Sequence, residues 1–225
     1  MANIAIILGE SGSGKSTSIK NLNPEETAII SVLGKVPPFK GSAKLYNTEN
    51  KNFFAVNDYS KIIKGLNYLG QQEHIKNIII DDLFFSMAQE NFAKADEVGY
   101  KKFTVMAQHF QQILQTAVNL PIEKKVFLMM HSQDVVSNGE IVRKEIKLVG
   151  RFVKEGFAPE ALCNIVLFCK PQYNEDGVPT YGFYTHTFKD NGCEYVCKSP
   201  MGMFEEDFIP NDLILVVNAM DEYYN

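Results

Sequence analysis

A glycine-rich segment near the start of the chain carries a lysine and two hydroxyl side chains at close spacing. Residues 9–17 read Gly-Glu-Ser-Gly-Ser-Gly-Lys-Ser-Thr and directly follow the apolar residues 4–8. Glycines let the backbone curl until successive N–H groups point at phosphate oxygens. The pattern predicts a P-loop, in which a strand runs into a loop that binds the phosphates of a nucleotide. The alternative is a glycine-rich turn with a surface lysine, which the preceding strand disfavours.

Each residue type in this segment has its own expected role. Lys15 brings a positive charge toward the β and γ phosphates, and we expect it to be exposed in the loop, while Ser16 offers an oxygen to Mg²⁺. The sequence therefore predicts ATP and Mg²⁺ as ligands, although a loop that reads phosphates leaves GTP open. The residues expected to bind the nucleotide are Gly9, Glu10, Ser11, Gly12, Ser13, Gly14, Lys15, Ser16 and Thr17.

A second apolar strand ends in two carboxylates. Residues 77–82 read Asn-Ile-Ile-Ile-Asp-Asp, which is typical of a Walker B segment. Beside the P-loop, Asp81 would hold Mg²⁺ opposite Ser16, and Asp82 would orient and deprotonate the attacking water. The alternative is that the aspartates cap the helix expected to begin near residue 84, since aspartate is a good N-cap.

A third apolar strand, residues 126–130, ends in the polar triplet His131-Ser132-Gln133. If this strand lies beside the Walker B strand, the triplet faces the γ-phosphate. Gln133 or His131 would then hydrogen-bond the phosphate or the water and report hydrolysis to the adjoining loop. The alternative, polar side chains at a strand end without such a role, stays open.

Apolar blocks alternate with amphipathic blocks along the 225 residues. This alternation predicts one α/β domain over residues 1–225, with a mostly parallel sheet flanked by helices. Strands are expected at residues 4–8, 28–33, 53–56, 77–80, 125–130 and 165–169, and helices at 15–21, 59–69, 84–95, 103–118 and 212–223. Residues 181–188 and 194–198 predict a late antiparallel hairpin. Residues 34–52, 132–147 and 172–180 are expected to be irregular loops.

Composition and charge narrow the functional classes. The net charge of −5 provides no overall basic field, so any contact with DNA has to come from a local patch. No segment approaches the roughly 20 apolar residues that span a membrane. The first apolar run is too short for a signal peptide, and we therefore expect a cytoplasmic protein. The four cysteines fit no zinc-binding spacing and are expected to be buried thiols.

Five segments taken together resemble a known family. They are residues 9–17, 32–41, 80–82, 131–133 and 198–204. Nearly end to end, the chain is similar to small AAA-type, RecA-like ATPases encoded by bacteriophages. The resemblance implies a RecA-like P-loop fold and Mg²⁺-dependent ATP hydrolysis in phage DNA recombination or replication, in the host cytoplasm. As partners it implies single-stranded DNA and a single-strand annealing or single-strand-binding protein.

The chain departs from RecA after the second expected strand, where Val32-Leu33-Gly34-Lys35 stands in place of a glutamate. This departure favours Asp82 as the catalytic carboxylate, with Glu10 as a weaker candidate, and the short side chain of Asp82 predicts slow hydrolysis. Two other functions stay open. One is a module that uses bound ATP to recruit partners with negligible turnover, and the other is a nucleotide or metabolite kinase.

Several basic residues have two interpretations. RecA-like enzymes commonly form homo-oligomers and complete the active site with a basic residue of the neighbouring subunit. Lys198, which ends the late hairpin, is the candidate for that catalytic role, and the alternative is a charge that protects a sheet edge. The only arginines are Arg143 and Arg151. Arg143, Lys144 and Lys147 suit DNA phosphates, but the acidic residues among them suit a solvated loop equally well.

Overall fold

Strands and helices follow the apolar blocks of the sequence. The computed structural model describes residues 1–150 and 158–224. In chain order the strands are β1 (Asn3–Gly9), β2 (Thr27–Ser31), β3 (Phe53–Ala55), β4 (Asn77–Asp81), β5 (Lys125–Ser137), β6 (Glu140–Ile146), β7 (Ile165–Tyr173), β8 (Pro179–Tyr184), β9 (Phe188–Asp190), β10 (Cys193–Tyr195) and β11 (Phe208–Pro210). The α-helices are α1 (Ser42–Leu45), α2 (Tyr59–Gly70), α3 (Phe84–Ala93), α4 (Lys101–Val118) and α6 (Leu213–Tyr224), and the 3-10 helices are η1 (Ser16–Asn21) and η2 (Pro159–Leu162).

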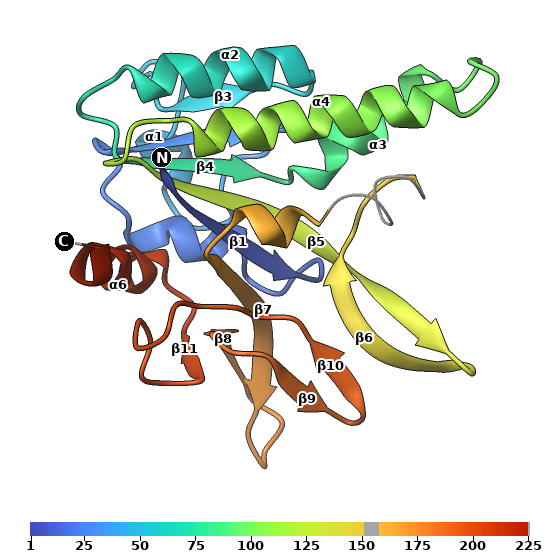
Figure 1. The fold of residues 1–225 in the computed structure, drawn as a ribbon. Coiled ribbons are helices and arrows are strands. Elements are labelled where there is room, and N and C mark those ends of the chain that lie inside the picture. The colour runs from blue at the N-terminus through green and yellow to red at the C-terminus, as the bar shows by residue number, and fades with distance from the viewer. Residues whose placement is uncertain (151–157, 225) are drawn as a thin grey trace.

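Within the described residues, eleven strands form a mixed sheet that is mostly parallel at its centre. Eight of them lie in the order β11-β8-β7-β1-β5-β4-β2-β3 (Figure 1), and the other three, β6, β9 and β10, branch from β5 through its pairing with β6. β1 lies between β5 and β7 and pairs parallel with both, and β5 pairs parallel with β4. The expected α/β class, with a mostly parallel sheet flanked by helices, is confirmed. Because parallel strands end at the same edge of a sheet, Gly9, Asp81 and His131 are brought to one edge.

The two faces of the sheet carry separate hydrophobic clusters. Alternate residues of β1 show this directly, since Ile6 packs in one cluster and Ile7 in the other, and both are fully buried. Helices α2, α3 and α4 cover the first face, while η1 and α6 cover the second (Figure 1). Burial on both faces explains why the central strands read as continuous apolar runs. None of the helices in the described residues has the length and apolar character needed to cross a membrane.

The expectation of an irregular loop at residues 132–147 is wrong. β5 continues to Ser137, turns through Asn138 and Gly139, and returns as β6, which pairs antiparallel with β5. Both turn residues have positive φ, 52° and 84°, which suits an Asn-Gly hairpin turn. The two strands project beyond the helical layers (Figure 1), and most of their side chains there are exposed or half-buried, apolar Val136 and Ile141 among them. The Asn-Gly pair is the sequence signal that identifies this hairpin.

The late antiparallel hairpin is present but shorter than expected. β9 and β10 pair through a turn at Asn191 and Gly192, whereas β8 ends at Tyr184 and pairs with β7 and β11 instead. Residues 172–180 are also more regular than expected, because β7 runs to Tyr173 and β8 begins at Pro179. The sheet therefore gains a second projecting hairpin, β7–β8, beside the edge where β1 ends (Figure 1).

Candidate functional site

A cleft of about 690 Å³ lies over the edge of the sheet at which β1, β4 and β5 end. Its floor is the glycine-rich loop that follows β1, and its walls come from the ends of β4 and β5, the segment after β2, and strand β8. The lining residues are Ser11, Gly12, Gly14, Lys15, Ser16, Thr17, Lys35, Val36, Pro38, Asp81, Asp82, Phe85, His131, Tyr181 and Asn211. Most of the loop residues expected to bind a nucleotide thus face one cavity.

The conformation of the loop requires its glycines. Gly12 and Gly14 have φ values of 79° and 103°, which side chains rarely tolerate. At Gly9 a Cβ atom would lie 2.6 Å from the carbonyl oxygen of Cys169 and 2.7 Å from Oγ of Ser13. The loop therefore curls tightly against β7. Ser13 and Gly9 lie beneath it rather than at the surface of the cleft.

Lys15 is buried, which corrects the expectation of an exposed side chain. It is 6% exposed, and its Nζ donates hydrogen bonds to the carbonyl oxygens of Gly9 at 2.8 Å and Glu10 at 2.7 Å. The curl of the loop causes this, because it folds Lys15 back over the first residues. Burial lowers the pKa of the Lys15 ammonium, and the nearby charges of Asp82 and Asp81 oppose that shift. The ammonium carries three N–H donors, so one is left over for a ligand in the cleft.

Ser16 and Asp81 meet across the cleft floor. The Ser16 hydroxyl donates to Oδ1 of Asp81 at 2.9 Å, and Asp81 is only 4% exposed. Burial, together with the charge of Asp82, raises the pKa of Asp81 to about 6. A bound divalent cation would remove that repulsion. The described residues hold no cluster of three or more His, Cys, Asp or Glu for a metal. A hydroxyl and a carboxylate are hard oxygen donors, and Mg²⁺ is commonly held by one or two such protein groups together with phosphates, so the pair fits Mg²⁺.

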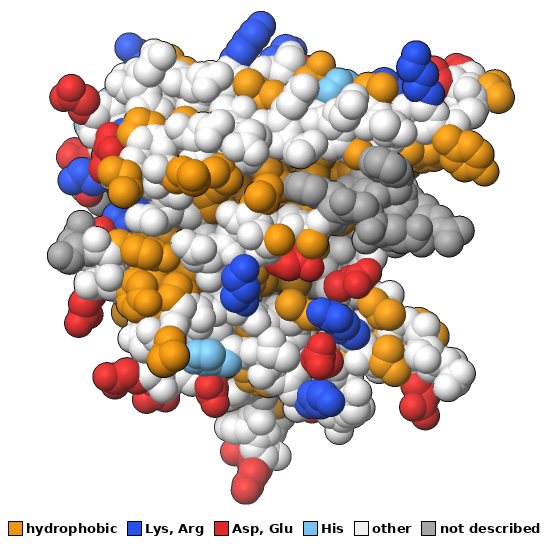
Figure 2. Space-filling view, in the orientation of Figure 1, with side chains coloured by type: hydrophobic (Ala, Val, Ile, Leu, Met, Phe, Trp, Pro, Cys, Tyr) orange, Lys and Arg blue, Asp and Glu red, His pale blue; other side chains and the backbone are white. Residues whose placement is uncertain are grey.

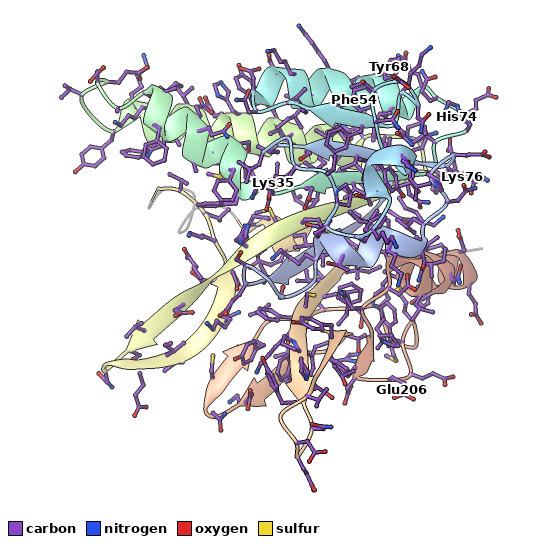
Figure 3. All side chains as sticks on the ribbon, turned by 180° about the vertical axis from the view of Figure 1, so that it is seen from behind. Lys35, Phe54, Tyr68, His74, Lys76 and Glu206 are labelled. Carbon is purple, nitrogen blue, oxygen red and sulfur yellow. The ribbon has the colours of Figure 1, made fainter. Side chains whose placement is uncertain are left out.

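Asp82 sits in a strained backbone conformation next to Asp81. Its φ is +59°, in the left-handed region, where a non-glycine residue costs about 1–2 kcal/mol. Nε2 of His131 lies 3.0 Å from Oδ1 of Asp82, and Nζ of Lys35 lies 3.9 Å from Oδ2. Burial by itself would raise the pKa of Asp82, but the hydrogen bond and charge of His131, together with the charges of Lys35 and Lys15, lower the pKa overall. Figure 3 shows Lys35 near the end of β4.

Of the two polar candidates that end the β5 apolar run, the structure brings only His131 to the cleft. The His131 ring packs edge-on against Phe85 and Phe84, with centroids 5.5 Å and 6.3 Å apart. Gln133 lies beyond the cleft lining, and its Nε2 donates to Oε1 of Glu145 on β6 at 2.7 Å. A contact between Gln133 and a phosphate stays a prediction, whereas His131 is already in contact with Asp82.

Glu10 points away from the cleft. Its carboxylate accepts a hydrogen bond from Nζ of Lys144 on β6 at 2.5 Å, and the same ammonium contacts Asp134 on β5 at 2.5 Å. Burial alone would lower the pKa of Lys144, but Asp134 and Glu10 raise it above its ordinary range. The weaker candidate for the catalytic carboxylate is thus committed to an ion pair that joins the loop to the β5–β6 hairpin.

The other cations of this hairpin also have partners within the chain. Nε of Arg143 lies 3.5 Å from Oε1 of Glu194 on β10, and Nζ of Lys147 lies 4.8 Å from the ring centroid of Phe84. Together with Lys144, these contacts leave the expected DNA-binding cluster mostly paired rather than free. The remaining arginine, Arg151, lies outside the described residues.

Lys198 lies apart from the cleft. Its backbone pairs with Val166, near the start of β7, and its Nζ donates to the carbonyl oxygen of Glu160 in η2 at 2.9 Å. The bridge places Lys198 beside the start of β7, which agrees with the alternative of a charge at a sheet edge. The structure does not bring it to the site of its own chain, and a role in a neighbouring subunit stays a prediction.

The sequence interpretation gave no binding role to several residues of the cleft, namely Val36, Pro38 and Phe85 and two others, Tyr181 and Asn211, that adjoin Gly14. Tyr181 lies on β8, and Asn211 follows β11, so both come from the part of the chain farthest from the glycine-rich loop. Nδ2 of Asn211 donates to the carbonyl oxygen of Gly14 at 3.0 Å. No local sequence pattern predicts such contacts, because they depend on how β8 and β11 pair with the sheet beside β7.

Comparison with known proteins adds no relative. No family model matches the chain, and no curated protein sequence is significantly similar to it. What the protein does is therefore inferred from its residues and from the geometry of the cleft.

Proposed function

We propose that this protein is a Mg²⁺-dependent, ATP-binding and ATP-hydrolysing enzyme with a RecA-like P-loop core. One observation carries the proposal: Lys15, Ser16, Asp81 and Asp82, which come from two separate segments of the sequence, converge on a single cleft. An ammonium, a hydroxyl and two carboxylates are the groups that phosphoryl transfer from a nucleotide requires. The position of β5 between β1 and β4 supports the same class, because it brings a third strand end to the γ-phosphate side.

In this proposal some residues of the cleft bind the nucleotide and others take part in its hydrolysis. Backbone N–H groups of the loop and the third donor of Lys15 bind the phosphate oxygens. Ser16 and Asp81 would hold Mg²⁺, which when bound neutralises charge on the phosphates. Asp82, kept ionised by its lowered pKa, accepts a hydrogen bond from the attacking water and orients it. His131 fixes the Asp82 carboxylate, and Lys35 adds positive charge at the mouth of the cleft.

The biological setting that we propose, phage DNA recombination or replication, rests on the resemblance of five segments to phage RecA-like ATPases. Figure 2 shows basic and acidic side chains interspersed on the visible face rather than gathered in one basic field. Single-stranded DNA as a partner is therefore proposed from the resemblance and not from charge. The same holds for a single-strand annealing or single-strand-binding protein.

Phosphate release from ATP, measured with and without Mg²⁺ and with and without single-stranded DNA, tests this proposal. We expect slow Mg²⁺-dependent release that rises when single-stranded DNA is added. Tight ATP retention without release would favour an ATP-switched binding module instead. Transfer of labelled phosphate to a small acceptor would favour a kinase.

Replacing Asp81 by asparagine is expected to raise the Mg²⁺ concentration needed for half-maximal hydrolysis by about tenfold or more. The amide keeps the shape of the side chain but removes the charge that attracts the cation. A titration of ATP hydrolysis against Mg²⁺ measures the shift, and Asp176→Asn, in an exposed loop, is the matched control. An unchanged Mg²⁺ requirement in Asp81→Asn would remove Asp81 from the metal site.

A further inference from the structure

The cleft extends past the glycine-rich loop on the side opposite the two carboxylates. Along the sheet, β4 lies on one side of β1, and β8 and β11 lie on the other (Figure 1). The two carboxylates at the end of β4 and the segment after β2 therefore lie toward one end of the cleft, and Tyr181 of β8 lies toward the other. Tyr181 is 44% exposed although it lines the cleft, so one part of its ring is open to a ligand.

Tyr181 is fixed to the loop through Asn211. The backbone N–H of Asn211 donates to the carbonyl oxygen of Tyr181 at 3.1 Å, and its side-chain amide donates to the carbonyl oxygen of Gly14 at 3.0 Å. A Cβ atom at Gly14 would lie 2.5 Å from Nδ2 of Asn211 and 3.3 Å from Cδ1 of Tyr181. The tyrosine ring thus stands directly against the phosphate-binding loop, in a position that the loop itself determines.

The order of groups along the cleft sets the direction of a bound nucleotide. If the proposed function holds, the terminal phosphates lie where Lys15, Ser16 and Asp81 converge, with the hydrolytic residues Asp82 and His131 beyond them. The ribose and the base must then extend past Gly14, toward the end of the cleft at which Tyr181 lies. A nucleobase is a flat aromatic ring, and an open tyrosine face beside the phosphate loop offers a surface on which it can stack.

We propose that Tyr181 forms the stacking surface for the nucleobase and that Asn211 holds it against the loop. This inference rests on the proposed function, and it assigns a binding residue to the base, which is the part of the nucleotide that the P-loop does not contact. The Asn211 amide is held between the loop and β7, since its Nδ2 donates to the carbonyl oxygen of Gly14 and its Oδ1 lies 3.6 Å from Sγ of Cys169. Tyr181 is therefore the binding residue at this end, and Asn211 is a positioning residue.

Binding of two probes separates the base from the phosphates. ATP carries a base, whereas inorganic tripolyphosphate does not, and both are titrated with Mg²⁺ by calorimetry. Tyr181→Ala and Tyr181→Leu are expected to weaken ATP binding by about tenfold while changing tripolyphosphate binding less than about twofold, since stacking involves only the base. Tyr181→Phe should bind ATP like the wild type. Tyr100→Ala, an exposed tyrosine that lines neither the cleft nor the pocket beside it, is the matched control.

The outcomes that would overturn the inference differ from those that would overturn the proposed function. ATP affinity unchanged in both Tyr181→Ala and Tyr181→Leu would place the base elsewhere, and so would an equal loss for ATP and tripolyphosphate. A wild-type protein that is folded yet binds neither probe would contradict the phosphate site itself. Melting temperatures close to that of the wild type identify variants that fold, and the exposure of Tyr181 favours this result.

Discussion

Replacing Lys15 by alanine is expected to abolish ATP hydrolysis, with a loss of at least about 10²–10³-fold, and to weaken ATP binding. Lys15 is the positive charge at the centre of the cleft, and no other ammonium lies in the glycine-rich loop. The loss of one well-placed donor to a phosphate or oxyanion costs a factor of this size. Phosphate release and equilibrium binding of a fluorescent ATP analogue measure the two effects.

Because Lys15 is buried, the experiment needs a control that separates the loss of its charge from the loss of its packing. Its ammonium donates to two carbonyl oxygens of the loop, so alanine also frees those acceptors. Lys15→Met keeps most of the side-chain volume without the charge and should show the same loss of activity with a smaller change in melting temperature. Lys20→Ala, an exposed lysine at the end of η1, should behave as the wild type. Full turnover in Lys15→Ala would contradict the P-loop assignment.

Replacing Asp82 by asparagine is expected to reduce hydrolysis by about 10²-fold or more while leaving ATP and Mg²⁺ bound. The change removes the negative charge that orients and deprotonates the attacking water, and general bases typically contribute factors of this size. Asparagine tolerates the left-handed backbone of position 82 about as well as aspartate does, so the fold should be retained. Single-turnover phosphate release with pre-bound ATP separates the hydrolytic step from binding.

The comparison between the two aspartates is the sharpest control. Asp81→Asn should respond to added Mg²⁺, whereas Asp82→Asn should stay slow at every Mg²⁺ concentration. We expect different responses because the two carboxylates have different contacts: Asp81 contacts Ser16, and Asp82 contacts His131. If the two variants respond alike to Mg²⁺, the division of roles between them is wrong.

The central strands and the main helices could be predicted from the sequence because each is a long run with a clear period. Residues 78–80 are apolar at successive positions and become the core of β4, which is buried on both faces. The amphipathic residues 103–118 lie within α4. The β5–β6 hairpin was missed because it projects from the layers and is largely exposed, so its apolar residues, such as Val136 and Ile141, do not alternate regularly with polar ones.

Part of the site could not be predicted because it depends on contacts between distant segments. Asn211 and Gly14 are 197 residues apart in the chain, and Lys144 and Glu10 are 134 residues apart. Residue type identified the cation Lys15 and the carboxylate Asp81, but not that Lys15 is folded inward or that Asp82 adopts a strained backbone. The pairing of Lys144 with Glu10 likewise follows from the course of β6, which the sequence did not reveal.

The most direct test of the central claim is equilibrium binding of ATP to the wild-type protein, with and without Mg²⁺, by isothermal titration calorimetry. The arrangement of Lys15, Ser16 and Asp81 predicts saturable binding of one ATP per chain, which Mg²⁺ strengthens and Lys15→Met weakens. A folded wild-type protein that shows no saturable ATP binding up to millimolar concentrations, with Mg²⁺ present, would contradict the account.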